Sequence, residues 1–432
     1  MIVNFSIKNF GPIKERQTLS FEAEKSTHLE DAYVFRSGKH RLLKVALIYG
    51  PNASGKTSLL EALEFLRNLV VFPKNKKTEE FDFEPFLFDR DTPHEHTELS
   101  IEFIKDNIRY FYEVKLNKKA IVSEELINWN PHKASLYKRT TDLSNQLTKI
   151  SFGSTVKIDT ASKKTLETNT LWNNTVVGGY LKTNIDFNEL KSVFSWFSGD
   201  LKPLIRTGTE LEDFVSDQIN SGNIKKPDVI EILKKADFHI SDIEIKEEEK
   251  EIPDHVLEFL TKQFEESKKE GKAAILRKKV KTLDLKLIHT VNETGYSLPF
   301  EMESNGTKRY YGFAGLLAFI LKDSMILPID ELESSLHPDL YEHFLLSFLM
   351  NSKDSQIIAT THNREILNKK DLFRNDAIWF TDKNEECATE LYSLADFDSS
   401  VVRDTTNVLN AYKSGKLGAT PNTADYYLDL SS

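Results

Sequence analysis

One stretch of the chain constrains its fold more than any other, because it joins an apolar run, a glycine-rich turn and an amphipathic segment. Val45–Tyr49 is an unbroken apolar run, as expected for a strand that is buried on both faces of a sheet. The turn after it contains Gly50 and Gly55, and apolar residues then recur at helical spacing from Leu59 to Leu66. This succession predicts a strand, a tight loop and a helix, which is the repeating unit of an α/β fold.

The turn itself has the spacing of a phosphate-binding loop. Residues 50–57 read Gly-Pro-Asn-Ala-Ser-Gly-Lys-Thr and match G-x-x-x-x-G-K-[ST] at every fixed position. Glycines let backbone N–H groups converge on phosphate oxygens, and the helix N-terminus adds partial positive charge. We expect Lys56 to reach the β- and γ-phosphates and the Thr57 hydroxyl to bind Mg²⁺. The predicted nucleotide-binding residues are Gly50, Pro51, Asn52, Ala53, Ser54, Gly55, Lys56, Thr57 and Ser58.

A second motif is the apolar stretch Met325–Ile329, which ends in two acidic residues, Asp330 and Glu331. Nucleotide hydrolysis needs one carboxylate near the metal and a second that orients or deprotonates water. We expect Asp330 to perform the first task and Glu331 the second. Pro328 is unusual within a central strand because proline cannot donate a ladder hydrogen bond, so a bulge or an unpaired edge is expected there.

Two further polar segments lie at the ends of predicted elements. The apolar strand Gln356–Thr361 delivers His362 to its carboxyl end, where open α/β sheets bind ligands. We expect this histidine to sense a γ-phosphate or to polarise water. Ser304 and Gly306 precede a helix predicted over 308–321, either as an ordinary cap or as a loop that presents amides to an anion.

In this order the motifs resemble the ABC-type ATPases of the SMC/RecF/OLD group, and in particular the bacterial RloA-like AAA ATPases of phage-defence and restriction loci. The segments that carry the resemblance are Gly50–Thr57, Glu303–Arg309, Ile329–Pro338, Thr360–His362 and the tail Asn410–Pro421. The resemblance implies that the cofactors are ATP and Mg²⁺. It also implies that Lys56 and Thr57 bind phosphate and the metal, that Asp330 supports the metal, that Glu331 is the catalytic base and that His362 is the switch histidine.

The resemblance further implies that the chain works as an oligomer. Ser304 and Gly306 would contact the γ-phosphate bound by the opposite protomer, so two heads would enclose ATP in a homodimer or a higher oligomer. Ser334–His337 would form the D-loop. The chain departs from the family in having no glutamine between Gln17 and Gln146, and Glu84 is our candidate for that missing glutamine.

These observations predict an α/β protein, namely an ABC-type ATPase head with a mixed sheet and a mainly α-helical insertion. The N-terminal half of the head is expected over residues 1–120, the insertion over 121–298 and the C-terminal half over 299–432. Short helices are predicted over 187–197, 210–219 and 227–236. The segment 247–279 is dense in Lys and Glu and is expected to form a solvated helical face, with a docking surface as the alternative. The middle insertion is the candidate region for partner docking.

Composition narrows the classes of function. The chain has 432 residues, and its 57 basic and 67 acidic side chains give a net charge of −10, which argues against a generally basic DNA-binding surface. A local basic groove, and hence a nucleic-acid partner, stays open. Cys387 is a single cysteine and cannot form an internal disulfide. We expect no leader, no membrane span and a cytoplasmic location.

The expected function is an ATPase that drives or gates a partner effector, a nuclease or toxin acting in trans, in anti-phage defence. Four alternatives stay open: an OLD-type nuclease on the same chain, a transporter subunit, an SMC/RecF-like DNA-binding ATPase of repair or restriction, and a slow ATP-dependent switch. The sequence after His362 is short for an appended nuclease domain. The polar run His94-Glu95-His96 could hold a metal, but no further ligands cluster near it in the sequence.

Overall fold

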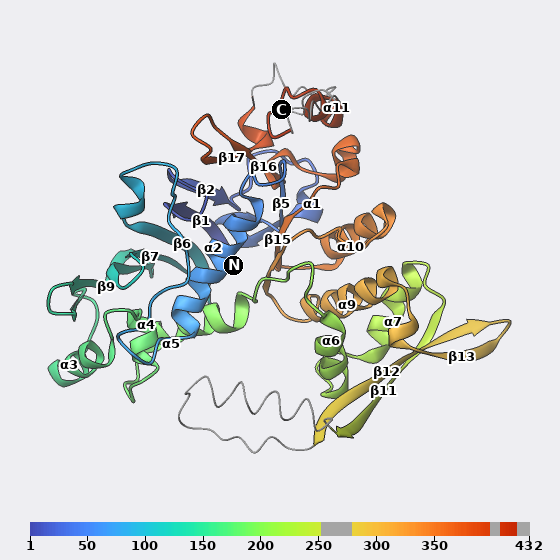
Figure 1. Ribbon diagram of the computed structural model, residues 1–432, viewed down its shortest axis with the longest axis horizontal. Helices are drawn as coiled ribbons and strands as arrows, with labels where there is room; N and C mark the ends of the chain where they lie inside the picture. Colours follow the sequence, from blue (N-terminus) through green and yellow to red (C-terminus); the bar gives the residue numbers. More distant parts are fainter. Residues whose placement is uncertain (252–278, 398–406, 421–432) are drawn as a thin grey trace, which may run out of the picture. The chain divides into compact units, whose positions relative to one another are not determined.

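The computed structural model describes residues 1–251, 279–397 and 407–420, which divide between two compact units (Figure 1). Unit 1 takes in residues 1–208, 323–334 and 345–432, and unit 2 takes in residues 209–322 and 335–344. The motifs predicted to bind nucleotide belong to unit 1, whereas Ser304 and Gly306 belong to unit 2. Among the described residues, no helix is both long enough and apolar enough to cross a bilayer.

A mixed five-stranded sheet lies at the centre of unit 1. Its strands, in spatial order, are β14 (Ile326–Ile329), β15 (Gln356–Thr360), β5 (Val45–Tyr49), β16 (Ile378–Lys383) and β17 (Thr389–Ser393). The first four are parallel and β17 is antiparallel to β16. Every residue of β5 is buried, because Leu47 pairs with Ala359 on one side and with Ile378 on the other. The α/β class with a mixed sheet is therefore confirmed.

Helix α2 (Lys56–Val71) begins directly after the glycine-rich loop that follows β5. Its leucines Leu59, Leu60, Leu63 and Leu66 are all fully buried, as their helical spacing predicts. The helix contacts β15 and also β1 (Ile2–Lys8), so it connects the five-stranded sheet to a second sheet (Figure 1).

Pro328 lies within β14, and the pairing of this strand explains how the sheet accommodates it. On one side β14 pairs with β15; on the other, the carbonyl of Pro328 accepts a hydrogen bond from the Ile205 N–H at 3.0 Å. Because N–H and C=O of one strand residue point to the same side, the missing donor of Pro328 faces the irregular segment around Ile205 and leaves the ladder to β15 intact. Strand β14 thus lies at the edge of the five-stranded sheet, and isolated bridges to Leu201 and Ile205 pair its outer side.

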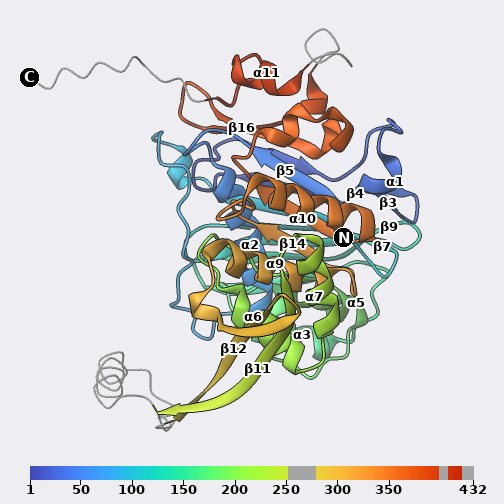
Figure 2. The ribbon, with the colours of Figure 1, turned by 90° about the vertical axis from the view of Figure 1, so that its right-hand side faces the viewer.

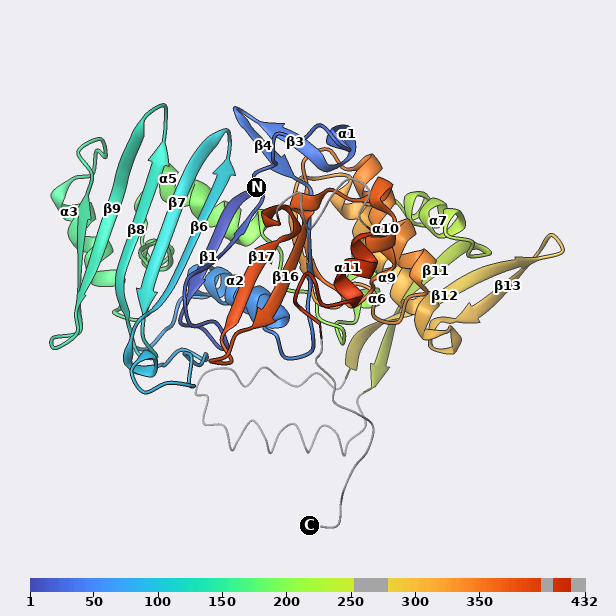
Figure 3. The same ribbon diagram turned by 90° about the horizontal axis from the view of Figure 1, so that it is seen from above.

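The second sheet of unit 1 is antiparallel throughout, and Figure 3 shows most of its strands side by side. Its strands, in spatial order, are β10 (Leu147–Phe152), β9 (Lys133–Asp142), β8 (Ile121–Trp129), β7 (Ile108–Leu116), β6 (Thr97–Lys105), β1 and β2 (Gln17–Ser20). The sequence predicts a mainly helical insertion over residues 121–298, but residues 121–152 form strands β8, β9 and β10 instead. They continue the N-terminal sheet, since Leu126 of β8 pairs with both Tyr112 and Tyr137.

The remaining elements of unit 1 are shorter. They are α1 (Glu30–Tyr33), β3 (Val34–Ser37), β4 (His40–Leu43), α3 (Thr160–Asn169), α4 (Val176–Tyr180), α5 (Asn188–Ser195) and α11 (Val408–Lys413). Helix α10 (Pro338–Asn351) begins in unit 2 and ends in unit 1. The helix predicted over 187–197 is confirmed as α5, within the usual uncertainty of helix ends.

In the described part of unit 2, helices α6, α7 and α9 and the start of α10 accompany a three-stranded antiparallel sheet. Its elements are α6 (Leu211–Asn220), α7 (Lys226–Lys235), α9 (Asn305–Ile320), β11 (Ile240–Glu251), β12 (Lys279–Val291) and β13 (Thr294–Pro299). The helices predicted over 210–219, 227–236 and 308–321 are confirmed. Gly312 and Gly315 of α9 let α6 approach closely, because added Cβ atoms would lie only 2.6 and 2.3 Å from the side chains of Leu211 and Val215.

The charged segment 247–279 differs from its predicted helical form where it is described. Residues 247–251 extend β11, and Lys279 begins β12, so the two strands form the long curved ribbon seen in Figure 2. Residues 252–278 lie outside the described part of the chain. The buried residues Ile243, Leu285 and Leu287 anchor the ribbon, and backbone pairing then continues it through the charged residues.

Candidate functional site

The glycine-rich loop at residues 50–57 is held in shape by the lysine within it. The Lys56 ammonium donates hydrogen bonds to the carbonyls of Gly50 and Pro51, each at 2.9 Å, and the side chain is buried. Burial lowers the pKa of Lys56, while the nearby carboxylates of Asp330, Glu331 and Glu333 act in the opposite direction. The loop therefore holds a cation close to three acidic side chains.

Two glycines of this loop stand where no other residue fits. A Cβ on Gly50 would lie 2.4 Å from the Thr381 carbonyl oxygen, and a Cβ on Gly55 would lie 2.3 Å from the Thr389 hydroxyl oxygen. Gly55 also has a φ of +99°, a backbone conformation that glycine adopts readily. The close approach of β16 and β17 thus explains both glycines of the motif.

Two threonines that the sequence did not single out support the loop from these strands. The Thr381 hydroxyl lies 2.6 Å from the Ser54 hydroxyl, and the Thr389 hydroxyl donates to the Ser54 carbonyl at 2.8 Å. Thr381 follows an apolar run, which is a weak signal. Thr389 carries no signal in the sequence, because only the antiparallel return of β17 brings it to the loop.

The acidic motif after β14 meets the start of α2. The Thr57 hydroxyl donates to both carboxylate oxygens of Asp330, at 3.1 and 3.2 Å, and Asp330 is buried. The Thr360 hydroxyl also donates to Asp330, at 2.6 Å, and accepts the Glu331 backbone N–H at 2.8 Å. Thr360 therefore connects the two acidic residues and fixes the backbone that carries them.

This convergence follows from strand order. Strands β14, β15 and β5 are adjacent and parallel, so their carboxyl ends lie at the same edge of the sheet. That edge brings together Asp330 and Glu331 after β14, His362 after β15 and the loop after β5. Chain segments about 270 residues apart are joined there by the hydrogen bonds between Thr57 and Asp330, at 3.1 and 3.2 Å.

His362 lies two residues beyond the end of β15 and is partly exposed to solvent. Its backbone N–H donates to the Glu333 Oε1 atom at 2.5 Å. Partial burial lowers the pKa of the His362 imidazole and the positive charge of Lys56 lowers it further, whereas Glu333 and Glu331 oppose this change.

The other predicted loop residues lie around this centre. Asn52 and Ala53 are exposed at the loop tip, where Ala53 has a φ of +62°, and Pro51 precedes them. Ser58 lies in the first turn of α2, next to Gly11. The tip therefore faces solvent while the two ends of the loop are fixed to the sheet.

Ser304 and Gly306 lie in unit 2, at the start of α9. Ser304 is the N-cap of this helix, and its hydroxyl accepts the Thr307 backbone N–H at 3.1 Å. Gly306 lies in the first turn, with the Ser335 carbonyl oxygen 3.5 Å from the position of an added Cβ. Within one chain these two residues form a regular helix start and are not joined by any described hydrogen bond to the residues of the glycine-rich loop.

Glu84 and the run His94-Glu95-His96 are the two weaker candidates from the sequence, and both lie outside the cluster described above. The Glu84 side chain is exposed and pairs with Lys118, and its backbone carbonyl accepts the Gly11 N–H at 2.7 Å. The Glu84 backbone thus supports the loop near Gly11, and its side chain pairs with Lys118 and with no residue of the acidic motif. Among the described residues, His94 and His96 belong to no group of three His, Cys, Asp or Glu side chains arranged to hold a metal.

The residues present fit a nucleotide with its metal. Mg²⁺ prefers oxygen ligands and is commonly held by one or two protein groups together with phosphate oxygens. The Asp330 carboxylate and the Thr57 hydroxyl supply such oxygens at one point, beside the Lys56 ammonium. The glycines at 50 and 55 let the loop pack closely on Thr381 and Thr389, which fixes the backbone that would face a phosphate.

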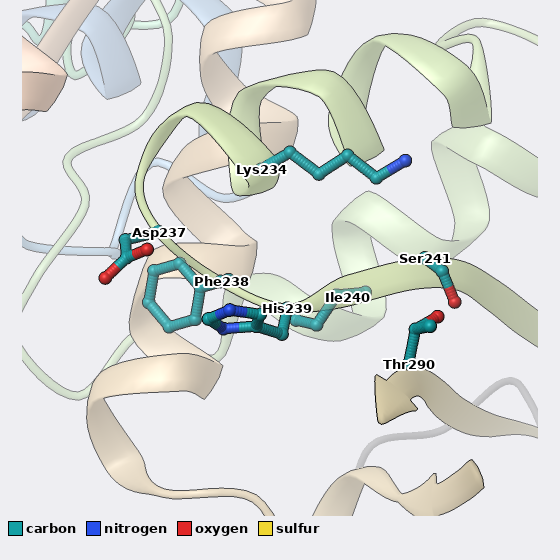
Figure 4. A pocket seen from close by; sticks show the side chains of 7 residues that line it. All are labelled: Lys234, Asp237, Phe238, His239, Ile240, Ser241 and Thr290. Carbon is teal, nitrogen blue, oxygen red and sulfur yellow. The ribbon is translucent and has the colours of Figure 1, made fainter. Parts of the chain in front are cut away.

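A cavity in unit 2 is separate from these residues. It has a volume of about 430 Å³ and is lined by Lys234, Asp237, Phe238, His239, Ile240, Ser241 and Thr290. Figure 4 shows the Phe238 and His239 rings side by side and the Lys234 side chain extending away from them. None of the residues predicted to bind nucleotide lines it.

Comparison with protein families gives one match over most of the chain. The model of the family described as "AAA domain, putative AbiEii toxin, Type IV TA system" matches residues 45–368. The matched range begins at β5 and includes the glycine-rich loop, the acidic motif and His362. No curated protein matches the chain.

Solved structures give distant similarities. The SMC head domain from Thermotoga maritima is 12% identical with a TM-score of 0.40, covering 91% of this chain and 98% of that one. An SMC head bound to the C-terminal winged-helix domain of ScpA is 12% identical with a TM-score of 0.42, covering 91% and 97%. The SMC head with an extended coiled coil bound to the C-terminal domain of ScpA, derived from Pyrococcus furiosus, is 13% identical with a TM-score of 0.40, covering 91% and 96%.

Proposed function

This chain belongs to the AAA-domain family whose model matches residues 45–368, and from that premise we propose that it binds ATP with Mg²⁺ and hydrolyses it to ADP and phosphate. The observation that carries the proposal is the pair of hydrogen bonds from Thr57 to Asp330, at 3.1 and 3.2 Å. A phosphate-binding loop and a buried acidic residue of a neighbouring strand meet there, as metal-assisted phosphoryl transfer requires.

In this proposal Lys56 is the main phosphate contact. Its ammonium is now satisfied by the carbonyls of Gly50 and Pro51, at 2.9 Å each, and would exchange these for β- and γ-phosphate oxygens. Thr57 and Asp330 would hold Mg²⁺. When bound, the metal supplies positive charge that stabilises the transferring phosphoryl group.

Glu331 is the proposed general base. Its backbone is fixed by the hydrogen bond to the Thr360 hydroxyl at 2.8 Å and has a φ of +47°, so the residue is held in a conformation that few residues adopt. From this position its carboxylate would orient and deprotonate the attacking water. His362, at the end of the neighbouring strand, would donate a ring N–H to a γ-phosphate oxygen.

Ser304 and Gly306 are proposed to act on the nucleotide of another copy. Their positions in unit 2, at the N-terminus of the 16-residue helix α9, suit contact with a phosphate across an ATP-bound dimer. The dimer or higher oligomer would then open on hydrolysis and drive or gate a protein effector. The family description names a putative toxin of a Type IV TA system, and we propose that the effector is a nuclease or toxin acting in trans in bacterial defence.

The test compares three purified variants with the wild type. Lys56→Ala is expected to abolish binding of a fluorescent ATP analogue in the presence of Mg²⁺. Glu331→Gln is expected to bind the analogue normally and to release phosphate at least about 100-fold more slowly, which is the scale of a lost general base. Lys77→Ala, which removes an exposed lysine beyond α2, is the control and should match the wild type. Normal turnover by Glu331→Gln would reject Glu331 as the base.

A further inference from the structure

Glu333 is an acidic residue to which the sequence assigns no role, and its carboxylate contacts His362 directly. Its Oε1 atom accepts the His362 backbone N–H at 2.5 Å. Its Oε2 atom is buried and, among the described residues, has no hydrogen-bond donor. An ionisable oxygen buried without a donor is costly, and native proteins rarely retain one without a use.

The segment that carries Glu333 is fixed on both sides. The Leu332 N–H donates to the Thr360 carbonyl at 3.1 Å, and the Leu332 side chain is fully buried. The Ser334 N–H donates to the Glu331 carbonyl at 2.9 Å and closes a tight turn. Glu333 is therefore held at a set distance from the end of β15, where His362 begins the next loop.

The negative charge of Glu333 affects the pKa of two residues of the proposed site. It raises the pKa of Lys56 and that of His362, against the larger effect of burial in each case.

We propose that Glu333 is the positioning residue of His362 in ATP hydrolysis. Oε1 holds the histidine backbone, and Oε2 is the acceptor kept for an N–H of the imidazole ring. A carboxylate that accepts one ring N–H stabilises the imidazolium, whose other N–H can then be donated to a γ-phosphate oxygen. The proposal rests on the ATPase function proposed above and adds a residue to it.

The kinetic test is a double-mutant cycle on Glu333 and His362. Glu333→Ala is expected to lower kcat by about 10- to 100-fold with KM for ATP changed less than about 3-fold, because the interaction serves the transition state. His362→Ala alone and the double variant should be equally slow, since the carboxylate acts only through the ring. Multiplying losses in the double variant, or an unchanged kcat in Glu333→Ala, would overturn the proposal.

A second variant tests whether a loss of activity could result from misfolding. Glu333→Gln preserves size and one carbonyl oxygen, so its unfolding transition should match that of the wild type. It replaces the Oε2 acceptor by a donor, and its kcat should still fall by about 10-fold or more. Wild-type turnover by Glu333→Gln would contradict the role of Oε2. Glu365→Ala removes an exposed glutamate of the same segment and serves as the control that keeps full activity.

A measurement without nucleotide separates this proposal from the ATPase function. Amide hydrogen exchange of residues 361–365 should be about 10-fold faster in Glu333→Ala than in the wild type, because the His362 N–H loses its acceptor. Unchanged exchange would refute the contact even if the protein hydrolyses ATP. A wild type that binds no ATP, together with faster exchange in Glu333→Ala, would instead refute the ATPase function and retain the contact.

Discussion

At Gly55 the backbone has a φ of +99°, and the Thr389 side chain occupies the space where a Cβ would project. Gly38 has a comparable positive φ of +59° but no atom within 4 Å of an added Cβ. The two glycines therefore separate two effects, the cost of the backbone conformation and the cost of a steric clash.

We expect Gly55→Ala to weaken binding of an ATP analogue by at least about 10-fold, because the clash displaces either the loop or Thr389. Gly38→Ala carries only the conformational cost, about 1–2 kcal/mol of unfolding free energy, and should bind the analogue normally. Titration of each variant with the analogue checks this. Equal affinities for the two variants would show that the contact with Thr389 does not shape the site.

His343 of unit 2 allows a prediction of how the free energy of unfolding depends on pH. Its Nδ1 atom lies 2.7 Å from the Tyr310 hydroxyl oxygen, and burial, with a smaller effect of Lys235, lowers the pKa of the imidazole. A histidine whose pKa is lower in the folded state binds more protons when unfolded. Its stabilising effect is therefore present above the unfolded pKa of about 6.5 and is lost as pH falls below it.

We expect the free energy of unfolding to fall between about pH 6.5 and pH 5 in the wild type, and to fall less steeply in His343→Gln, which does not titrate. Urea unfolding at a series of pH values measures both slopes. Identical slopes would mean that His343 does not contribute to the pH dependence.

Among the elements, the tail 407–420 has the clearest structural role. The Tyr412 ring of α11 packs against Tyr49, the last residue before the glycine-rich loop, with ring centres 6.3 Å apart. Arg364, two residues after His362, lies over the same ring at 5.3 Å. The tail thus contacts the segments that carry the loop and the histidine.

We expect Tyr412→Ala to lower the free energy of unfolding by about 3 kcal/mol, because a buried aromatic ring is lost. Tyr296→Ala removes an exposed tyrosine of β13 and should change that quantity by no more than about 0.5 kcal/mol. Chemical denaturation of the two variants gives the comparison. A loss as small for Tyr412 as for Tyr296 would contradict the buried role of the tail.

Elements were predictable from the sequence where their pattern is local. Helices α5, α6, α7 and α9 and strands β5, β14 and β15 follow from the apolar pattern of their own residues. Residues 121–152 were not recognised as strands of the first sheet, because their alternation is imperfect and only pairing with β7 decides their place. The Lys and Glu residues in 247–251 favour a helix in the sequence, but the hydrogen-bonded ladder with β12 outweighs their helix propensity.

At the scale of the whole molecule, the residues proposed to act on nucleotide belong to two compact units. Lys56, Thr57, Asp330 and Glu331 belong to unit 1, and Ser304 belongs to unit 2. If Ser304 serves the nucleotide of another copy, two variants that are inactive alone can form one complete site together.

We expect Ser304→Arg and Lys56→Ala to release phosphate slowly when assayed separately and to recover activity when mixed. In a mixed dimer, the intact loop of the Ser304→Arg chain would meet the intact Ser304 of the other chain. Ser221→Arg, at an exposed serine of unit 2, is the control and should be active alone. No recovery, together with a single-chain mass for Glu331→Gln with ATP and Mg²⁺, would reject the composite site.

The sequence by itself determined what depends on neighbours along the chain: the strand, loop and helix around residues 45–66, and the polar residues at the ends of β14 and β15. Only the tertiary structure decided that Thr381, Thr389 and Glu333 belong to the site. Their contacts arise from strand order and register between segments far apart in the chain. Pairing of that kind depends on the packing of the whole sheet, which no short stretch of residues encodes alone.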